Sequence, residues 1–216
     1  MLSVHSNTKK LTAHLNRVQR KQIPFATAKA LTKTAKDVRE SLKKALPRYL
    51  HRPTGNAATG KGGGIIGSVQ VDHATKYNVT ARVGFAGLGF DKTLWRESPA
   101  EIMRYHIKGG TRFPNKRAIA VPVKQTTNQY GNLKRNAIKN LLANKTKYFS
   151  GTPKGMSNAG IYQRQKKKLK MLIAWEPKAT YQGGRFPFKG IVKLSVAKNY
   201  RKRFERALQD ALDTAR

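Results

Sequence analysis

The feature of the sequence that most constrains the fold is an apolar repeat between residues 31 and 46. Its members recur at intervals of four, three, four and four residues: Leu31, Ala35, Val38, Leu42 and Leu46. These intervals place all five side chains on one face of an α-helix. Because proline suits the first turn of a helix, the pattern predicts a long helix from about Pro24 to about Pro47.

A helix with such a face must bury it against another element. The residues expected at this contact are Leu31, Val38 and Leu42 on the helix and Val71, Val83 and Met171 or Ile173 on a sheet. We expect Lys29, Lys33 and Lys36, on the other faces, to remain exposed to solvent.

Alternating apolar residues predict the strands of that sheet. Two strands are expected in the stretch from Ile65 to Phe85, with Val69 and Val71 in the first, residues 79–85 in the second and a turn at 72–76. Residues 118–123 predict an edge strand, since Pro122 cannot donate a hydrogen bond to a neighbouring strand. Residues 168–177, KLKMLIAWEP, predict a buried strand.

Further helices are expected outside these strands. Residues 8–21 predict a short amphipathic helix, and Ser98 with Glu101 forms the pattern of a capping box at the start of another, which Gly109 and Gly110 should end. A C-terminal helix is expected from Ser195 nearly to Arg216. Its apolar residues are spaced by four: Tyr200, Phe204, Leu208 and Leu212.

The C-terminal helix carries three acidic residues, Glu205, Asp210 and Asp213. One interpretation is a docking face for a basic neighbouring copy of the chain. The other is pairing within the helix, because Arg201 and Arg206 each lie four residues before a carboxylate. We favour pairing within the helix, since charge runs usually form solvated faces.

Residues 54–64, TGNAATGKGGG, contain most of a phosphate-binding loop but have Gly62 where a Ser or Thr must hold magnesium. The glycines instead predict a mobile loop without nucleotide affinity. Residues 124–168 are polar and predict an insertion or arm with one helix near 133–142. The sequence therefore predicts one α+β domain over 1–216: a long N-terminal helix and a C-terminal helix packed on a small, mainly antiparallel sheet, with long mobile loops.

The chain has 45 Lys and Arg against 10 Asp and Glu, a formal net charge of +35. Such an excess favours anionic partners, because self-repulsion destabilises a compact monomer. The cations expected to contact DNA or a partner are Lys134, Arg135, Lys166, Lys167, Lys168 and Lys170. Two interpretations stay open: contact with phosphates independent of base sequence, or lysines that only keep an assembly intermediate soluble.

Nothing in the sequence predicts an enzyme, a metal site or a cofactor. The chain has no cysteine, and its five histidines, at positions 5, 14, 51, 73 and 106, have no metal-binding spacing. The acidic residues form no pair of the nuclease or polymerase type. No run approaches the roughly 18 apolar residues that span a membrane, so we expect a soluble chain without membrane contact.

Several segments together resemble the minor tail protein Z and tail completion proteins of tailed bacteriophages. They are QIPFATAKALTKTAKDVRESL at 22–42, Pro53-Thr54-Gly55, Gly67-Ser68-Val69 and the closing RKRFERALQDALDTAR. The resemblance covers about half of the chain and does not include 124–168.

The resemblance implies a non-enzymatic virion protein at the head-tail junction, or neck, made in the host cytoplasm during assembly. It implies a homo-oligomeric ring that meets phage connector and tail proteins, with a basic surface facing DNA or the tape-measure protein. A free nucleic-acid-binding protein that ignores base sequence is the alternative, because it explains the charge equally well.

Overall fold

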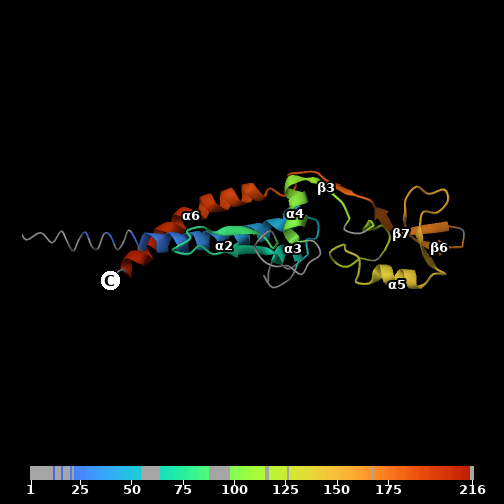
Figure 1. Ribbon diagram of the computed structural model, residues 1–216, viewed down its shortest axis with the longest axis horizontal. Helices are drawn as coiled ribbons and strands as arrows, with labels where there is room; N and C mark the ends of the chain where they lie inside the picture. Colours follow the sequence, from blue (N-terminus) through green and yellow to red (C-terminus); the bar gives the residue numbers. More distant parts are fainter. Residues whose placement is uncertain are drawn as a thin grey trace, which may run out of the picture. The chain divides into compact units, whose positions relative to one another are not determined.

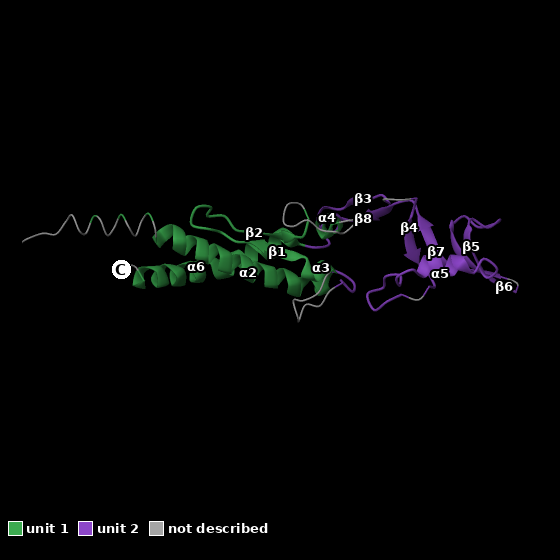
Figure 2. Cartoon of the chain, turned by 60° about the horizontal axis from the view of Figure 1, so that its bottom comes forward, with its two compact units in different colours: residues 1–49, 55–103, 187–216 green, residues 50–54, 104–186 purple. Residues whose placement is uncertain are grey.

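The computed structural model describes residues 12, 16, 20, 22–54, 64–87, 98–114, 117–125, 127–166 and 168–214. Residue contacts divide the chain into two compact units (Figure 2). We call residues 1–49, 55–103 and 187–216 the helical unit, and residues 50–54 and 104–186 the sheet unit. The sequence predicts a single domain and does not reveal this division. Most of the helix expected at 8–21 and of the glycine-rich loop lies outside the described residues.

The helical unit is built on two long helices, α2 (Ile23–Tyr49) and α6 (Phe188–Asp213), which lie side by side (Figure 1). The apolar repeat is confirmed from Ala35 to Leu46, while Leu31 is only half-buried. Small residues let the two helices approach closely at one end of the pair. They are Ala26 and Ala30 on α2 and Ala207 and Ala211 on α6, flanked by Tyr200, Phe204 and Leu208.

Two ion pairs fix α2 and α6 in antiparallel register. The guanidinium of Arg203 donates two hydrogen bonds of 2.9 Å to the carboxylate of Asp37, and Lys29 donates one of 2.8 Å to Asp210. The expectation that Lys29 and Lys33 are exposed is therefore wrong, because both are half-buried, Lys29 in this ion pair, whereas Lys36 is exposed as expected. The hydrogen bond from Lys29 also lowers the pKa of Asp210.

The C-terminal helix differs from the prediction in two ways. It begins at Phe188, directly after Pro187 and seven residues before Ser195, although Gly190 in its first turn disfavours a helix. Asp210 hydrogen-bonds to Lys29 on α2 and not, as expected, to Arg206 on its own helix. The other expected pair, Arg201 with Glu205, is present at 2.8 Å.

A two-stranded antiparallel sheet, β1 (Val69–Asp72) and β2 (Arg82–Phe85), packs against α2. The segment before it is a short helix, α3 (Gly64–Gly67), where the sequence suggests a strand. Residues 79–81, expected in the second strand, belong instead to the loop that connects β1 and β2. In this loop, the backbone N–H of Ala74 donates a hydrogen bond of 3.1 Å to the hydroxyl of Thr32 on α2. The expectation that one sheet carries Val71 and Val83 together with Met171 or Ile173 is wrong, because Met171 and Ile173 lie in a different sheet, in the sheet unit.

The capping box at Ser98 is confirmed. The backbone N–H of Ser98 donates to the Glu101 carboxylate at 3.1 Å, and the N–H of Glu101 donates to the Ser98 hydroxyl at 3.2 Å. The helix that follows is α4 (Pro99–Lys108), which ends at Gly109 and Gly110 as predicted. Reciprocal bonding of this kind satisfies two backbone N–H groups that the first turn leaves without partners.

The sheet unit contains two antiparallel sheets. One pairs β3 (Gly110–Arg112) with β8 (Ala179–Tyr181). The other has four strands in the order β4 (Ile119–Pro122), β7 (Lys168–Glu176), β6 (Gly160–Gln165) and β5 (Tyr148–Gly151). β4 lies at the edge and β7 is an inner strand, as predicted.

Residues 124–168, expected to form an insertion or arm, supply half of this four-stranded sheet. They contain β5, β6 and the helix α5 (Ala137–Ala143), the helix expected near 133–142. Leu141 of α5 packs in a core with Ile161, Leu172 and Ile173. Two long helices, shorter helices and small antiparallel sheets make the chain an α+β protein, as the sequence predicts.

Candidate polyanion-binding surface

The cations singled out in the sequence fall into two groups in the sheet unit. Lys166 and Lys168 are exposed where β6 turns into β7, and Lys170 is half-buried in β7 opposite Gln163. Lys167 lies outside the described residues. Lys134 and Arg135 are exposed just before the first residue of α5, and no described interaction joins their side chains to those of the hairpin.

Arg164 brings a different pair of lysines to the hairpin. Its Nη1 donates to the backbone carbonyls of Lys145 at 2.7 Å, Thr146 at 3.1 Å and Tyr148 at 3.4 Å. The backbone N–H of Arg164 also donates to the carbonyl of Lys147, at 2.9 Å. The turn after α5 is thus held against β6, and its lysines join the same end of the sheet.

We call this group of cations the sheet-end patch. Its members are Lys145, Lys147, Arg164, Lys166, Lys168 and Lys170, from the starts of β5 and β7 and the end of β6. Neighbouring strands lie about 5 Å apart. The three strands therefore bring six cations to one end of the sheet, across a width on the order of 10 Å. Successive residues of a strand face opposite sides, so Lys168 and Lys170 lie on one face of the sheet and Arg164, opposite Leu169, on the other.

Aromatic rings position two of these cations. The guanidinium of Arg164 lies 4.5 Å from the ring centroid of Phe149, and that ring stacks on Tyr162 at 5.8 Å. The ammonium of Lys147 lies 5.7 Å from the ring of Tyr148. Contact with the negative face of a ring restrains a long cationic side chain while its charge stays accessible. The patch is thus partly organised before any ligand binds.

Almost no negative charge offsets the patch within the sheet unit. Between Arg104 and Phe186 the sequence contains a single acidic residue, Glu176. Glu176 ends β7, whereas Lys168 begins it. At about 3.3 Å per residue, the eight steps between them separate the carboxylate from the patch by roughly 26 Å, more than twice the screening length of about 8 Å at physiological salt.

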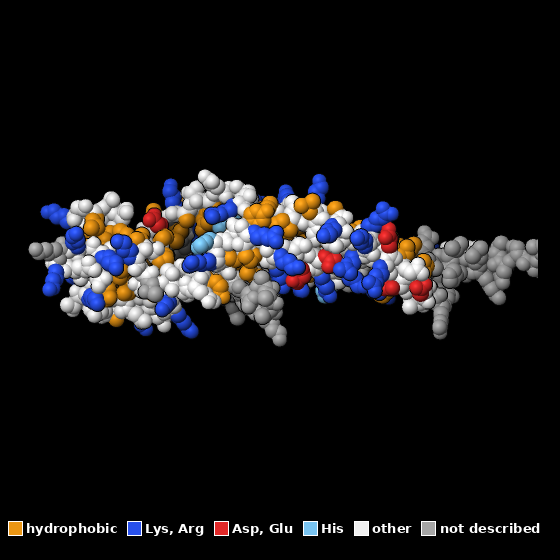
Figure 3. Space-filling model, turned by 180° about the vertical axis from the view of Figure 1, so that it is seen from behind, with side chains coloured by type: hydrophobic (Ala, Val, Ile, Leu, Met, Phe, Trp, Pro, Cys, Tyr) orange, Lys and Arg blue, Asp and Glu red, His pale blue; other side chains and the backbone are white. Residues whose placement is uncertain are grey.

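The helical unit has a different charge pattern, because most of its described carboxylates pair with its own cations. Asp37 pairs with Arg203, Asp210 with Lys29 and Glu205 with Arg201. Glu40 and Asp72 likewise pair with basic neighbours. In Figure 3, acidic side chains accordingly lie among the basic ones over the helical unit. The sheet unit therefore offers the more concentrated positive surface.

The described residues hold no group of three or more His, Cys, Asp or Glu side chains that could bind a metal. The ring of His106 meets the edge of Tyr181 at 5.3 Å, and its buried Nδ1 has no hydrogen-bond partner among the described residues. Burial, and then the charge of Arg185, lowers the pKa of His106. This environment favours the neutral form of the His106 ring.

No helix in the described part of the chain has both the length and the apolar character needed to cross a membrane. Comparison of the sequence with protein-family models gives no match, and comparisons with curated proteins and with solved structures give none either. The sheet-end patch and the resemblance of the sequence are therefore the basis for a functional proposal.

Proposed function

We propose that this chain is a non-enzymatic structural protein of a phage virion that helps to complete the tail at the neck, as a homo-oligomeric ring. We further propose that its sheet-end patch contacts the DNA backbone there. The phage setting rests on the resemblance of residues 22–42 and 201–216 and of the two short motifs between them. The observation that supports DNA contact is the concentration of six cations at one end of the sheet, far from Glu176.

The patch is suited to phosphates and not to base edges. Lysine and arginine side chains that neutralise phosphates release counterions, which supplies affinity that does not depend on base sequence. One DNA strand carries a charge about every 3.4 Å, so the end of the sheet, about 10 Å wide, can meet several phosphates. Such contacts suit a protein that holds whatever sequence lies at the end of a genome.

A free nucleic-acid-binding protein is the second candidate, because the same patch would serve it. The oligomeric state of the chain distinguishes the two proposed functions. A virion protein of the proposed kind forms a defined oligomer, which sedimentation velocity measures across protein concentrations. A chain that sediments as a monomer throughout would favour the free nucleic-acid-binding protein.

The DNA contact predicts a specific dependence on salt. We expect the logarithm of the affinity for duplex DNA to fall linearly with the logarithm of salt concentration, with a slope of about −0.9 per phosphate neutralised. The variant Lys147→Ala/Lys166→Ala/Lys168→Ala removes three exposed cations of the patch. It should flatten the slope by up to about 3 units, measured by fluorescence anisotropy.

The matched control removes three exposed cations from the helical unit: Lys36→Ala/Lys193→Ala/Lys202→Ala. Both variants have the same net charge, so a specific role of the patch requires a flatter slope in the first variant alone. Equal slopes in the two variants would show that DNA responds to total charge. An unchanged slope in the patch variant would exclude these lysines from the contact.

A further inference from the structure

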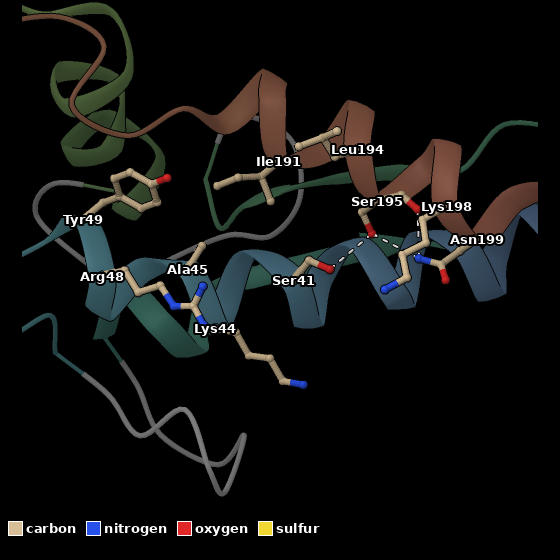
Figure 4. Close-up of a pocket in the computed structure, with 10 residues that line it drawn as sticks. All are labelled: Ser41, Lys44, Ala45, Arg48, Tyr49, Ile191, Leu194, Ser195, Lys198 and Asn199. Carbon is tan, nitrogen blue, oxygen red and sulfur yellow. Dashed lines mark hydrogen bonds between the residues drawn. The ribbon is translucent and has the colours of Figure 1, made fainter.

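A groove runs between the C-terminal half of α2 and the N-terminal half of α6, entirely within the helical unit (Figure 4). Its volume is about 430 Å³, within the range of about 300–1,000 Å³ typical of ligand sites. Polar residues close it at one end. Ser41 and Ser195 share a hydrogen bond of 3.2 Å, and Asn199 donates to the carbonyl of Ser195 at 2.8 Å.

The groove opens because the side chains between α2 and α6 differ in size from one end of the helix pair to the other. At one end, Ala26 of α2 and Ala207 of α6 belong to a closely packed cluster of small residues. Past the Ser41–Ser195 bond, Ala45 and the larger Ile191 line the groove. Figure 4 shows Ile191 pointing from α6 toward α2.

Four apolar residues line the groove; we call them its apolar floor, and two of them are well exposed to solvent. Leu194 is 74% exposed and Tyr49 42% exposed, and both line it together with Ala45 and Ile191. Single exposed apolar residues are ordinary on protein surfaces. Gathered in one concave site, they instead indicate a surface that binds a partner.

The rim of the groove carries only positive charge. Lys44 and Arg48 of α2 and Lys198 of α6 are exposed lining residues, and none of the described lining residues is acidic. No ion pair within the described part of the chain involves any of these three cations. A partner that fills the groove must therefore present apolar side chains flanked by carboxylates.

We propose that this interhelix groove docks an acidic amphipathic helix of a partner protein. The lining residues extend over nine residues of each helix, from Ser41 to Tyr49 and from Ile191 to Asn199, which is eight steps along the helix axis. At 1.5 Å per residue this is about 12 Å, or roughly two helical turns. A docked helix would place apolar anchors at positions i, i+4 and i+7 on the floor and acidic residues beside Lys44, Arg48 and Lys198.

A nucleic acid fits this groove less well than a helix does. Phosphates would meet the cationic rim, but they would leave Ile191 and Leu194 without apolar partners. An amphipathic helix satisfies both the rim and the floor, because its apolar stripe and its charged flanks run parallel. The groove lies in a different unit from the sheet-end patch, so its occupancy does not depend on the proposed DNA contact.

The test uses a fluorescent synthetic peptide of about 18 residues, with leucines at i, i+4, i+7 and i+11 and glutamates on the flanks. It is titrated with the full chain at about 150 mM salt, where weak surface attraction is largely screened. We expect saturable binding that Leu194→Glu and Lys198→Glu each weaken by at least about tenfold. A peptide of the same composition in scrambled order should bind at least about tenfold more weakly.

Two variants on the same helix serve as controls. Leu212→Glu changes another exposed leucine of α6 and Lys202→Glu another exposed lysine, both outside the groove. Neither should alter peptide affinity more than about twofold, and circular dichroism establishes that all four variants remain helical.

Three results would overturn the proposal. The first is equal binding of the scrambled peptide, which would show attraction to bulk charge. The second is a Leu194→Glu variant with unchanged affinity. The third is displacement of the peptide by duplex DNA in the Lys147→Ala/Lys166→Ala/Lys168→Ala background, which would assign the groove to nucleic acid.

Discussion

Replacing Leu42 by alanine is expected to lower the free energy of unfolding of the helical unit by about 2–5 kcal/mol. Leu42 lies in the middle of α2, and its side chain is 0% exposed. It belongs to the buried face that also includes Val38 and Leu46. Removal of its isobutyl group loses apolar burial and leaves a cavity, because the surrounding side chains relax only in part. Urea unfolding followed by circular dichroism measures the change.

Lys36→Ala is the control for this prediction, since Lys36 lies on the same helix but is exposed. It should change the free energy of unfolding by less than about 0.5 kcal/mol. Similar losses in the two variants would contradict the assignment of the buried face of α2.

Replacing Gly109 by alanine should destabilise the sheet unit by more than the conformational strain of one residue. Gly109 ends α4 with a φ of +78°, where an L side chain costs roughly 1–2 kcal/mol. A Cβ at this position would also lie 2.6 Å from the backbone nitrogen of Gly183. Backbone cannot rotate away as a side chain can, so we expect a total loss above about 3 kcal/mol, measured by urea unfolding.

Gly131→Ala is a matched control. Gly131 has the same φ of +78°, but a Cβ there would meet nothing within 4 Å. The two variants share the conformational cost, so their difference isolates the close approach of Gly109 to Gly183. If both variants lose the same free energy of unfolding, the close approach of Gly109 to Gly183 adds no cost to the substitution.

Local features of the fold could be read from the sequence because their causes lie within a few residues. The capping box needs only Ser98 and Glu101, three positions apart. The edge position of β4 follows from Pro122, whose nitrogen carries no hydrogen. The start of α6 was misplaced for a local reason as well, since Gly190 weakens the helical pattern and packing against α2 compensates.

The partner of α2 could not be read in this way. An apolar face shows that a helix must be buried, but it does not identify the element that buries it. The structure places α6 and the β1–β2 hairpin there, whereas the sequence suggested a sheet that includes Met171 or Ile173. The ion pairs of Asp37 with Arg203 and of Lys29 with Asp210 join residues more than 160 positions apart.

The charge of the candidate site was likewise determined by the sequence, and its arrangement by the tertiary structure. The sequence alone establishes +35 and singles out the lysines near 166–170. Lys145 and Lys147 join these lysines only through the register of β5 on β6 and the hydrogen bonds from Arg164. Lys134 and Arg135 do not join them, because they precede the N-terminus of α5. Composition and periodicity describe each segment separately, whereas strand register depends on contacts between segments, and those form only when the chain folds.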